Sequence, residues 1–212
     1  RRKTVPGESG DTGNGGINVS RHRSEEKRRA LMEAAIDLFS TQGFHATPTQ
    51  QISERAGVSA GTLFRYFRTK EELIDSLYTS VTAALTDAVN EAIRPEKPVE
   101  EQIKNVKREV LCWMFKNPKQ ALFFEQFSSA PNLTGKAKGE AILRISALDD
   151  LYHKAVSCGL LAGINREVFL ANFWYPNFML LHLHAFGTLQ CGIEETIDQA
   201  VTSMWCGLAK NP

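Results

Sequence analysis

The sequence predicts an all-α fold, in which a small N-terminal three-helix unit precedes a larger helical domain. Apolar residues recur at the three- and four-residue spacing of amphipathic helices, and the segments between them carry Gly and Pro. Beyond Pro98 there is no Asn-Gly hairpin signal and no sustained alternation of apolar and polar residues. A chain of 212 residues with 42% hydrophobic and 23% charged residues can bury a core, and these values exclude collagen-like, disordered and disulfide-scaffold classes.

The first helix is expected to follow a glycine-rich N-terminus. Residues 1–20 contain few aliphatic side chains, so we expect them to form a flexible tail. Ser24 is a suitable N-cap, and Gly43 is a suitable stop because glycine adopts positive φ without strain. Between them the apolar residues fall on one helical face: Leu31, Ala34, Ala35, Leu38 and Phe39.

Two short helices follow. Thr47 is placed to cap the second helix, with Pro48 at its first position. Gly57 permits a tight turn, and Ser59 is placed to cap a third helix that ends near Tyr66. Two short helices joined by a turn that contains glycine predict a helix-turn-helix.

The remaining elements are also predicted to be helical. Thr69 and Glu72 form a capping-box pattern that starts a fourth helix, which is expected to end near Ile93. We therefore expect a helix-turn-helix domain over residues 21–70 and a larger helical domain over residues 71–212. The helices of the larger domain are expected near 98–116, 118–129, 136–158, 165–188 and 193–209.

The segment 27–77 carries a more specific pattern than a bare helix-turn-helix. Its first helix ends in Ala-Ala-x-x-Leu-Phe, residues 52–59 read Ile-Ser-Glu-Arg-Ala-Gly-Val-Ser, and residues 61–67 read Gly-Thr-Leu-Phe-Arg-Tyr-Phe. This segment resembles the DNA-binding domain of the TetR/AcrR family of bacterial transcriptional regulators, although residues 49–51 depart from the commoner start of the second helix. The resemblance implies a DNA-binding regulator whose larger domain binds an effector and forms a homodimer.

Local charge agrees with a DNA-binding N-terminal domain. Residues 21–70 carry nine Lys and Arg against five Asp and Glu, whereas the whole chain has a formal charge of only +1. A nearly neutral chain excludes a uniformly basic coat, so contact with nucleic acid must come from a local patch. A double-stranded DNA operator is therefore the expected partner.

The candidate DNA contacts lie mainly on the third helix. At its start small side chains permit close approach and hydroxyl groups can hydrogen-bond DNA; these residues are Ser59, Ala60, Gly61 and Thr62. Arg65 can contact guanine or can simply be solvated. By the resemblance, Tyr66 and Lys70 match phosphate-clamping positions; the alternative is a half-buried Tyr and a solvated Lys. The set is completed by Arg23, Lys27 and Thr49.

Aromatic residues are concentrated in the larger domain and suggest an apolar effector pocket with few polar groups. The candidate ligand-binding residues are Trp113, Phe123, Phe124, Phe127, Tyr152, His153 and Trp174. The alternative for each aromatic residue is an ordinary place in the core. We expect no metal or cofactor, because His182 and His184 point about 200° apart on a helix and no phosphate-binding or dinucleotide motif occurs.

The last two helices, from Val168 to Leu208, are the candidate homodimer surface. Residues 168–193 carry no formal charge, and the final helix has an apolar stripe at helical spacing: Ile197, Val201, Met204, Trp205 and Leu208. These stripes can instead pack inside one subunit. A membrane span over 168–193 is the less favoured interpretation, because Pro176 and five polar residues interrupt the stretch: Asn172, Asn177, His182, His184 and Gln190.

The sequence therefore predicts a cytoplasmic, ligand-responsive regulator, most simply a repressor released from a palindromic operator by a lipophilic or aromatic effector. No N-terminal secretion signal is apparent, and the four cysteines lack CxxC spacing, so buried free thiols are expected. Two alternatives remain: an all-helical enzyme or small-molecule carrier with a fortuitous helix-turn-helix, and a regulator that responds to no effector. The enzyme reading needs a catalytic constellation, and the sequence shows none.

Overall fold

The computed structural model describes residues 15–128, 146–161 and 163–210. Within these ranges the chain is helical, and the only β pairing is an isolated bridge between Leu161 and Ala209. The expected all-α class is therefore confirmed. The helices are α1 (Gly15–Gln42), α2 (Thr49–Arg55), α3 (Ala60–Tyr66), α4 (Lys70–Ala92), α5 (Val99–Lys116), α6 (Pro118–Ser128), α8 (Ser146–Ser157), α9 (Arg166–Ala185) and α10 (Ile193–Leu208).

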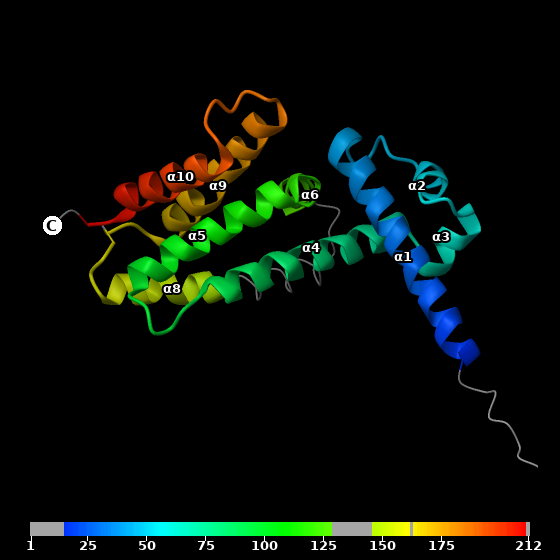
Figure 1. Ribbon diagram of the computed structural model, residues 1–212, viewed down its shortest axis with the longest axis horizontal. Coiled ribbons are helices and arrows are strands. Elements are labelled where there is room, and N and C mark those ends of the chain that lie inside the picture. Colours follow the sequence, from blue (N-terminus) through cyan, green and yellow to red (C-terminus); the bar gives the residue numbers. More distant parts are fainter. Residues whose placement is uncertain (1–14, 129–145, 162, 211–212) are drawn as a thin grey trace, which may run out of the picture.

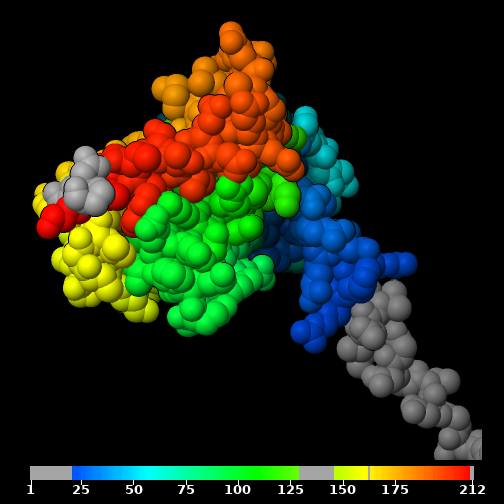
Figure 2. Space-filling model, turned by 60° about the vertical axis from the view of Figure 1, so that its left-hand side comes forward, coloured from blue at the N-terminus to red at the C-terminus, as the bar shows by residue number. Residues whose placement is uncertain are grey.

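The helices form two groups that α4 connects (Figure 1). The first group contains α1, α2 and α3, and α4 passes from beside it into the second group, which contains α5, α6, α8, α9 and α10. In the space-filling view α10 lies along α5, and the connection between α9 and α10 projects from the body of the molecule (Figure 2). Helix α6 returns to contact α1, so the two groups meet along a second seam.

The N-terminal group is held together by a small apolar core. Leu31, Ala35 and Phe39 on α1 are fully buried, as are Ile52 on α2 and Leu63 on α3. The spacing of the α1 residues places them on one face of the helix, so burying that face against the two short helices fixes their positions. The unit therefore presents the remaining face of α3 to solvent.

Two of the predicted helix caps are present. The Ser59 side chain accepts a hydrogen bond from the backbone N–H of Thr62 at the start of α3. The Thr69 side chain accepts one from the backbone N–H of Glu72 at the start of α4. The reciprocal half of the expected capping box differs, because Glu72 accepts a hydrogen bond from the backbone N–H of Arg68, at 2.7 Å, one residue before the cap.

Two other expected caps are wrong. Helix α1 already begins at Gly15, so Ser24 lies inside it, where its hydroxyl is 3.0 Å from the Tyr66 hydroxyl. Thr47 is buried and donates a hydrogen bond to the Gly43 carbonyl at 2.7 Å, so it closes the turn after α1 instead of capping α2. Residues 1–14 of the expected tail lie outside the described part of the chain.

The later helices begin and end close to their expected positions. Helix α4 ends at Ala92, and the helix expected over 136–158 is described from Ser146 onward, its earlier residues lying outside the described ranges. The expectation of buried thiols is wrong: Cys158, Cys191 and Cys206 are exposed, and Cys112 is only half-buried. Among the described residues, no helix combines the length and apolar character that crossing a membrane requires.

Candidate nucleic-acid interface

Helix α3 presents an exposed N-terminal end with small side chains. Ser59, Ala60 and Gly61 are exposed, and a methyl group added at Gly61 would meet no atom of the protein within 4 Å. The Ser59 and Thr62 hydroxyls are 2.9 Å apart, so the first turn is held rigidly by its own side chains. This end can therefore approach another surface closely without a clash from its own chain.

Basic side chains surround the exposed face of α3. Arg65 is exposed on α3, while Arg23 and Lys27 are exposed on the N-terminal part of α1. Arg68, in the turn after α3, is exposed too, although it was not among the candidate contacts. Four cations near one short helix form a local positive patch on a nearly neutral chain, which favours a polyanion as the partner.

Tyr66 is held in place by its neighbours. Its hydroxyl is hydrogen-bonded to Ser24 on α1, and the Arg65 guanidinium lies 5.3 Å from the centre of its ring. The Ser24 hydrogen bond, followed by Arg65 and the charge of Lys27, lowers the pKa of the Tyr66 hydroxyl. The sequence around Ser24 indicates only a helix cap, because the hydrogen bond to Tyr66 joins residues 42 positions apart.

Lys70 is turned toward its own chain in this structure. Its ammonium donates a hydrogen bond to the Phe44 carbonyl and lies 3.9 Å from the centre of the Phe44 ring. Burial lowers the pKa of the Lys70 ammonium. An ammonium group has three donors, so phosphate contact stays a prediction, but Lys70 also ties the start of α4 to the turn that follows α1.

An ion-pair network lies behind α2 and was not expected from the sequence. Asp37 on α1 accepts a hydrogen bond from Arg55 on α2 at 3.0 Å and one from Lys119 on α6 at 2.5 Å. The hydrogen bond from Lys119, and then that from Arg55, lowers the pKa of the Asp37 carboxyl against the opposing effect of burial. Arg55 therefore shares the single negative charge of Asp37 with Lys119, and Thr49 is half-buried at the start of α2.

The structure does not gather the candidate ligand-binding residues around one cavity. Phe123 and Phe127 are buried in the seam between α1 and α6, where both rings pack against Phe39 at 6.3 and 5.9 Å between centroids. They lie in the core because α6 turns this face toward α1. Tyr152 is buried on α8 and donates a hydrogen bond to the Ile164 carbonyl, and His153 beside it is exposed.

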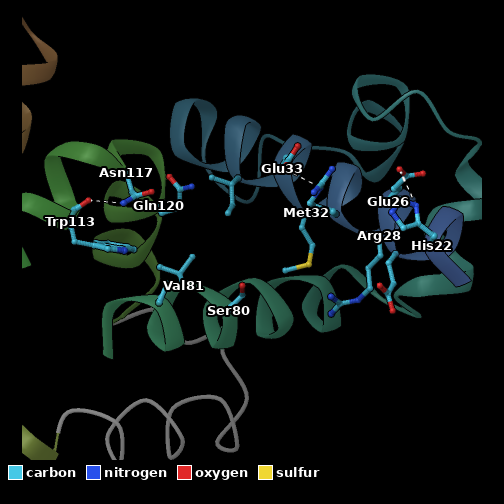
Figure 3. Close-up of a pocket in the computed structure, with 14 residues that line it drawn as sticks. His22, Glu26, Arg28, Met32, Glu33, Ser80, Val81, Trp113, Asn117 and Gln120 are labelled. Atoms are coloured by element: carbon cyan, nitrogen blue, oxygen red, sulfur yellow. Dashed lines mark hydrogen bonds and ion pairs between the residues drawn. The ribbon is translucent and has the colours of Figure 1, made fainter. Parts of the chain in front are cut away.

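Trp113 lines a groove of about 820 Å³ between α1, α4 and the junction of α5 with α6 (Figure 3). Met32 and Val81 point into it from opposite sides, and the carbonyl of Trp113 accepts a hydrogen bond from Asn117 at 2.9 Å. The rim on α1 carries both signs of charge, and Arg29 pairs there with Glu33 at 3.6 Å. A groove with mixed, internally paired charges favours no single class of charged ligand.

Phe124 and Trp174 are the two candidate residues that share a pocket. Their ring centres are 6.0 Å apart, and both line a pocket of about 340 Å³ between α6 and α9. This volume lies at the lower end of the range for small-molecule sites. Aromatic content pointed to both residues, whereas no sequence pattern pointed to Glu125 on α6 or Glu167 on α9, which also line the pocket.

A buried lysine also escaped sequence analysis. Lys107 on α5 is 1% exposed, and it donates hydrogen bonds to the Phe173 carbonyl at 2.6 Å and to the Asn177 side chain. Burial lowers its pKa from 10.5 to about 7. Its spacing was a usable signal, because Ile103, Val110 and Leu111 lie four residues before and three and four residues after Lys107 and place it on the buried face of α5.

Comparisons with known proteins agree with this arrangement. Residues 31–77 match the family model of bacterial regulatory proteins of the tetR family. The chain is 31% identical over 155 residues to the HTH-type transcriptional regulator RutR of Escherichia coli, a match that covers 70% of each protein. It is 30% identical over 80 residues to the uncharacterized HTH-type transcriptional regulator YhgD of Bacillus subtilis, covering 38% of this chain and 42% of YhgD.

The fold has a similar counterpart among solved structures. A TetR family transcription regulator from Marinobacter aquaeolei superposes with a TM-score of 0.81 at 22% identity, covering 90% of this chain and 100% of that one. These relatives are transcription regulators and not enzymes, which removes the main competing interpretation of the helix-turn-helix.

Proposed function

Because this chain belongs to the TetR family of bacterial regulatory proteins, we propose that it is a ligand-responsive repressor that binds a palindromic operator as a homodimer. A small lipophilic or aromatic effector releases it from the DNA. Residues 21–70 read the operator, and residues 71–212 bind the effector and form the dimer. Transcription regulation and DNA binding are properties of the family; the repressor role, the operator symmetry and the effector are parts of the proposal.

The exposed first turn of α3 is the observation that carries the proposal. It combines small side chains that permit close approach with a side-chain cap at Ser59, and exposed cations lie on α3, in the turn after it and on the N-terminal part of α1. An α-helix fits the major groove and reads base edges with its N-terminal residues. We assign Gly61 and Thr62 to the base-facing side of α3, Arg65 to guanine, and Arg23, Lys27 and Tyr66 to the phosphates that flank it.

Helix α6 supports a route from the effector to α3. One face of α6 carries Phe124 in the pocket shared with α9, and another carries Phe123 and Phe127 in the seam with α1. Lys119 on the same helix pairs with Asp37 on α1. If α6 has two positions and the ligand binds one of them more tightly, the ligand shifts the equilibrium toward that position by its difference in affinity. Because α6 packs against α1, the position of α1, and with it that of α3, changes as well.

Selection of bound duplexes from a random pool tests the proposal. A two-fold dimer should select inverted half-sites about one helical turn, or a multiple of it, apart. Affinity for the selected duplex should fall steeply with salt, because cations on the protein release counterions from the phosphates. Selection of unsymmetrical sites, or of none, would contradict the palindromic operator.

Replacing Arg65 with Ala separates base reading from phosphate contact. We expect relaxed specificity at one base position of each half-site, with a loss of about 1–3 kcal/mol on the preferred base. Arg29→Ala is the matched control, because Arg29 is exposed on α1 and pairs with Glu33. A uniform loss on all duplexes with Arg65→Ala would assign Arg65 to phosphate.

A further inference from the structure

The pocket between α6 and α9 has a lining that selects for charge. We propose that it binds a lipophilic organic monocation, such as an aromatic quaternary or tertiary ammonium ion. This inference rests on the proposed function, because it names the chemical class of the effector. Six lining residues carry the argument, four aromatic and two acidic: Phe124, Trp174, Tyr175, Phe178, Glu125 and Glu167.

The aromatic residues supply π faces at one end of the pocket. Phe124 and Phe178 are buried, with ring centres 6.2 Å apart. The Trp174 ring is tilted by 51° to that of Phe124, so the two rings do not cover each other by stacking flat. A cation within about 6 Å of such a ring is attracted by the negative face of its π system, and most strongly by that of tryptophan.

The carboxylates decide the sign of the ligand's charge. Glu125 on α6 and Glu167 in the first turn of α9 both line the pocket, and none of its described lining residues is Lys or Arg. The nearby Arg166 is engaged by Asp149 through two hydrogen bonds of 2.9 and 2.7 Å. Among the described lining residues an anionic ligand would therefore meet two carboxylates and neither a Lys nor an Arg, whereas a cation would be attracted by both carboxylates.

Glu125 links this charge selection to the helix that approaches the DNA-binding unit. One of its carboxylate oxygens is 2.9 Å from a ring nitrogen of His182 on α9, so the residue joins the two helices that enclose the pocket. A ligand cation that approaches Glu125 competes with His182 for the same carboxylate. Binding of a cation is therefore expected to change the position of α6 relative to α9. A neutral ligand that makes only apolar contacts would leave the bond between Glu125 and His182 in place.

Three probes that share a phenylalkyl chain and differ in the charge of their end group test the charge preference on the full chain. They are phenylpropyl-trimethylammonium, its neutral isostere with a tert-butyl group in place of the trimethylammonium, and the corresponding phenylalkyl carboxylate. Calorimetry gives each affinity, and quenching of Trp174 fluorescence in a Trp113→Phe, Trp205→Phe background reports occupancy of this pocket. We expect the cation to bind about tenfold more tightly than the neutral isostere, and the carboxylate to bind least tightly.

Glu167→Gln is the variant that isolates the charge, because it keeps the shape of the side chain. We expect it to lower the affinity for the cation about threefold or more and to leave the neutral isostere unchanged. Glu91→Gln, an exposed position on α4 away from the pocket, is the matched control and should change neither affinity.

Operator binding, measured on the same samples, separates this inference from the proposed function. If the chain binds its operator but the isostere binds as tightly as the cation, or Glu167→Gln has no effect, the cationic class is wrong while the regulator remains. If the chain binds no operator, the proposed function fails, and the three affinities still decide whether the pocket prefers a cation.

Discussion

At Gly61 a single substitution is expected to have opposite effects on stability and on DNA binding. Gly61 lies in α3 with open space around it, so Ala at this position meets no steric obstacle within the protein. Alanine is the better helix former, so we expect Gly61→Ala to raise the free energy of unfolding by about 0.5–1 kcal/mol. If the backbone here approaches DNA closely, the same change should weaken operator binding.

Gly207→Ala is the matched control for this prediction. Gly207 lies in α10, and a methyl group added there also meets no atom within 4 Å. Chemical denaturation should show a similar gain in stability for both variants, while fluorescence anisotropy should show weaker operator binding for Gly61→Ala alone. Unchanged operator affinity of Gly61→Ala would move the DNA contact away from the start of α3.

The buried ammonium of Lys107 should make stability depend on pH. The unfolded chain holds this proton up to the ordinary pKa of 10.5, whereas the folded protein loses it near pH 7. Between these values the unfolded state binds more protons, so raising the pH favours the folded state. We expect the free energy of unfolding to rise by about 1 kcal/mol per pH unit above pH 7.

Urea denaturation at pH 7 and pH 8.5 measures this slope. Both pH values lie below the ordinary pKa of 9.0 of the Cys112 thiol, and burial raises that pKa in the folded protein. The variant that tests the slope replaces both partners, as Lys107→Met with Asn177→Leu, because the Asn177 side-chain oxygen accepts a hydrogen bond from Lys107, and its buried amide nitrogen has no hydrogen-bond partner among the described residues. The slope should disappear in this variant and persist in Lys104→Met on the same helix. A slope that survives the double replacement would belong to another group.

At the scale of whole elements, helix α6 carries the seam between the two groups of helices. Phe127 is 1% exposed, and its ring centre lies 5.9 Å from that of Phe39 on α1 and 4.5 Å from that of Phe123. Removing a buried Phe costs the transfer free energy of the ring and leaves a cavity. We expect Phe127→Ala to lower the free energy of unfolding by about 3–5 kcal/mol.

Phe64→Ala is the control, because Phe64 on α3 is 47% exposed and should cost less than about 1 kcal/mol on this measure. Thermal unfolding followed by circular dichroism compares the two. If Phe127→Ala and Phe64→Ala both lower the free energy of unfolding by a similar, small amount, Phe127 is not part of the core. The milder Phe127→Leu should stay folded and keep its affinity for ligands of the α6–α9 pocket, which distinguishes a core residue from a ligand-binding one.

The elements were predictable where their signals are local. Ser59 and Thr69 cap helices through backbone groups only three residues away, so the sequence alone indicates where α3 and α4 begin. Contacts between distant residues left no such signal. The bond between Lys70 and Phe44 spans 26 residues, and the burial of Phe127 depends on how α6 meets α1, so neither follows from the pattern around it.

At the scale of the whole molecule, the two helices expected to form the dimer differ in what they expose. The apolar stripe of α10, including Met204 and Trp205, is buried in the subunit, where α10 packs against α5. That part of the expectation is corrected, because the stripe already has a partner. Helix α9 instead exposes Met179 at 61%, and Phe186 directly after its end is 76% exposed, while Tyr175 at 71% lines the α6–α9 pocket.

Met179 and Phe186 are seven positions apart, which places them on one face of a helix, and Val168 and Leu183 are also exposed on α9. An exposed apolar surface of this kind marks a protein interface, and a two-fold dimer would pair this face with its copy and so present two α3 helices to one duplex. The dimer surface that we propose is therefore this face of α9, with the exposed polar side of α10 beside it. A charge placed at Met204 of α10 would not test this surface, because Met204 is buried and the charge would disrupt the subunit itself.

Met179→Asp places a charge at the centre of the proposed dimer surface while leaving the core of the subunit intact. Each dimer would bring two such carboxylates together in an apolar contact, so we expect the variant to sediment as a monomer. Its helical content by circular dichroism should match that of the parent chain, and its affinity for the operator should collapse, because one recognition helix meets only one half-site.

Val156→Asp is the control, since Val156 on α8 is 48% exposed and lies away from this face. It should remain dimeric and bind the operator normally. A dimeric Met179→Asp variant would place the interface on another surface, and a monomeric variant with full operator affinity would remove the need for a dimer in reading DNA.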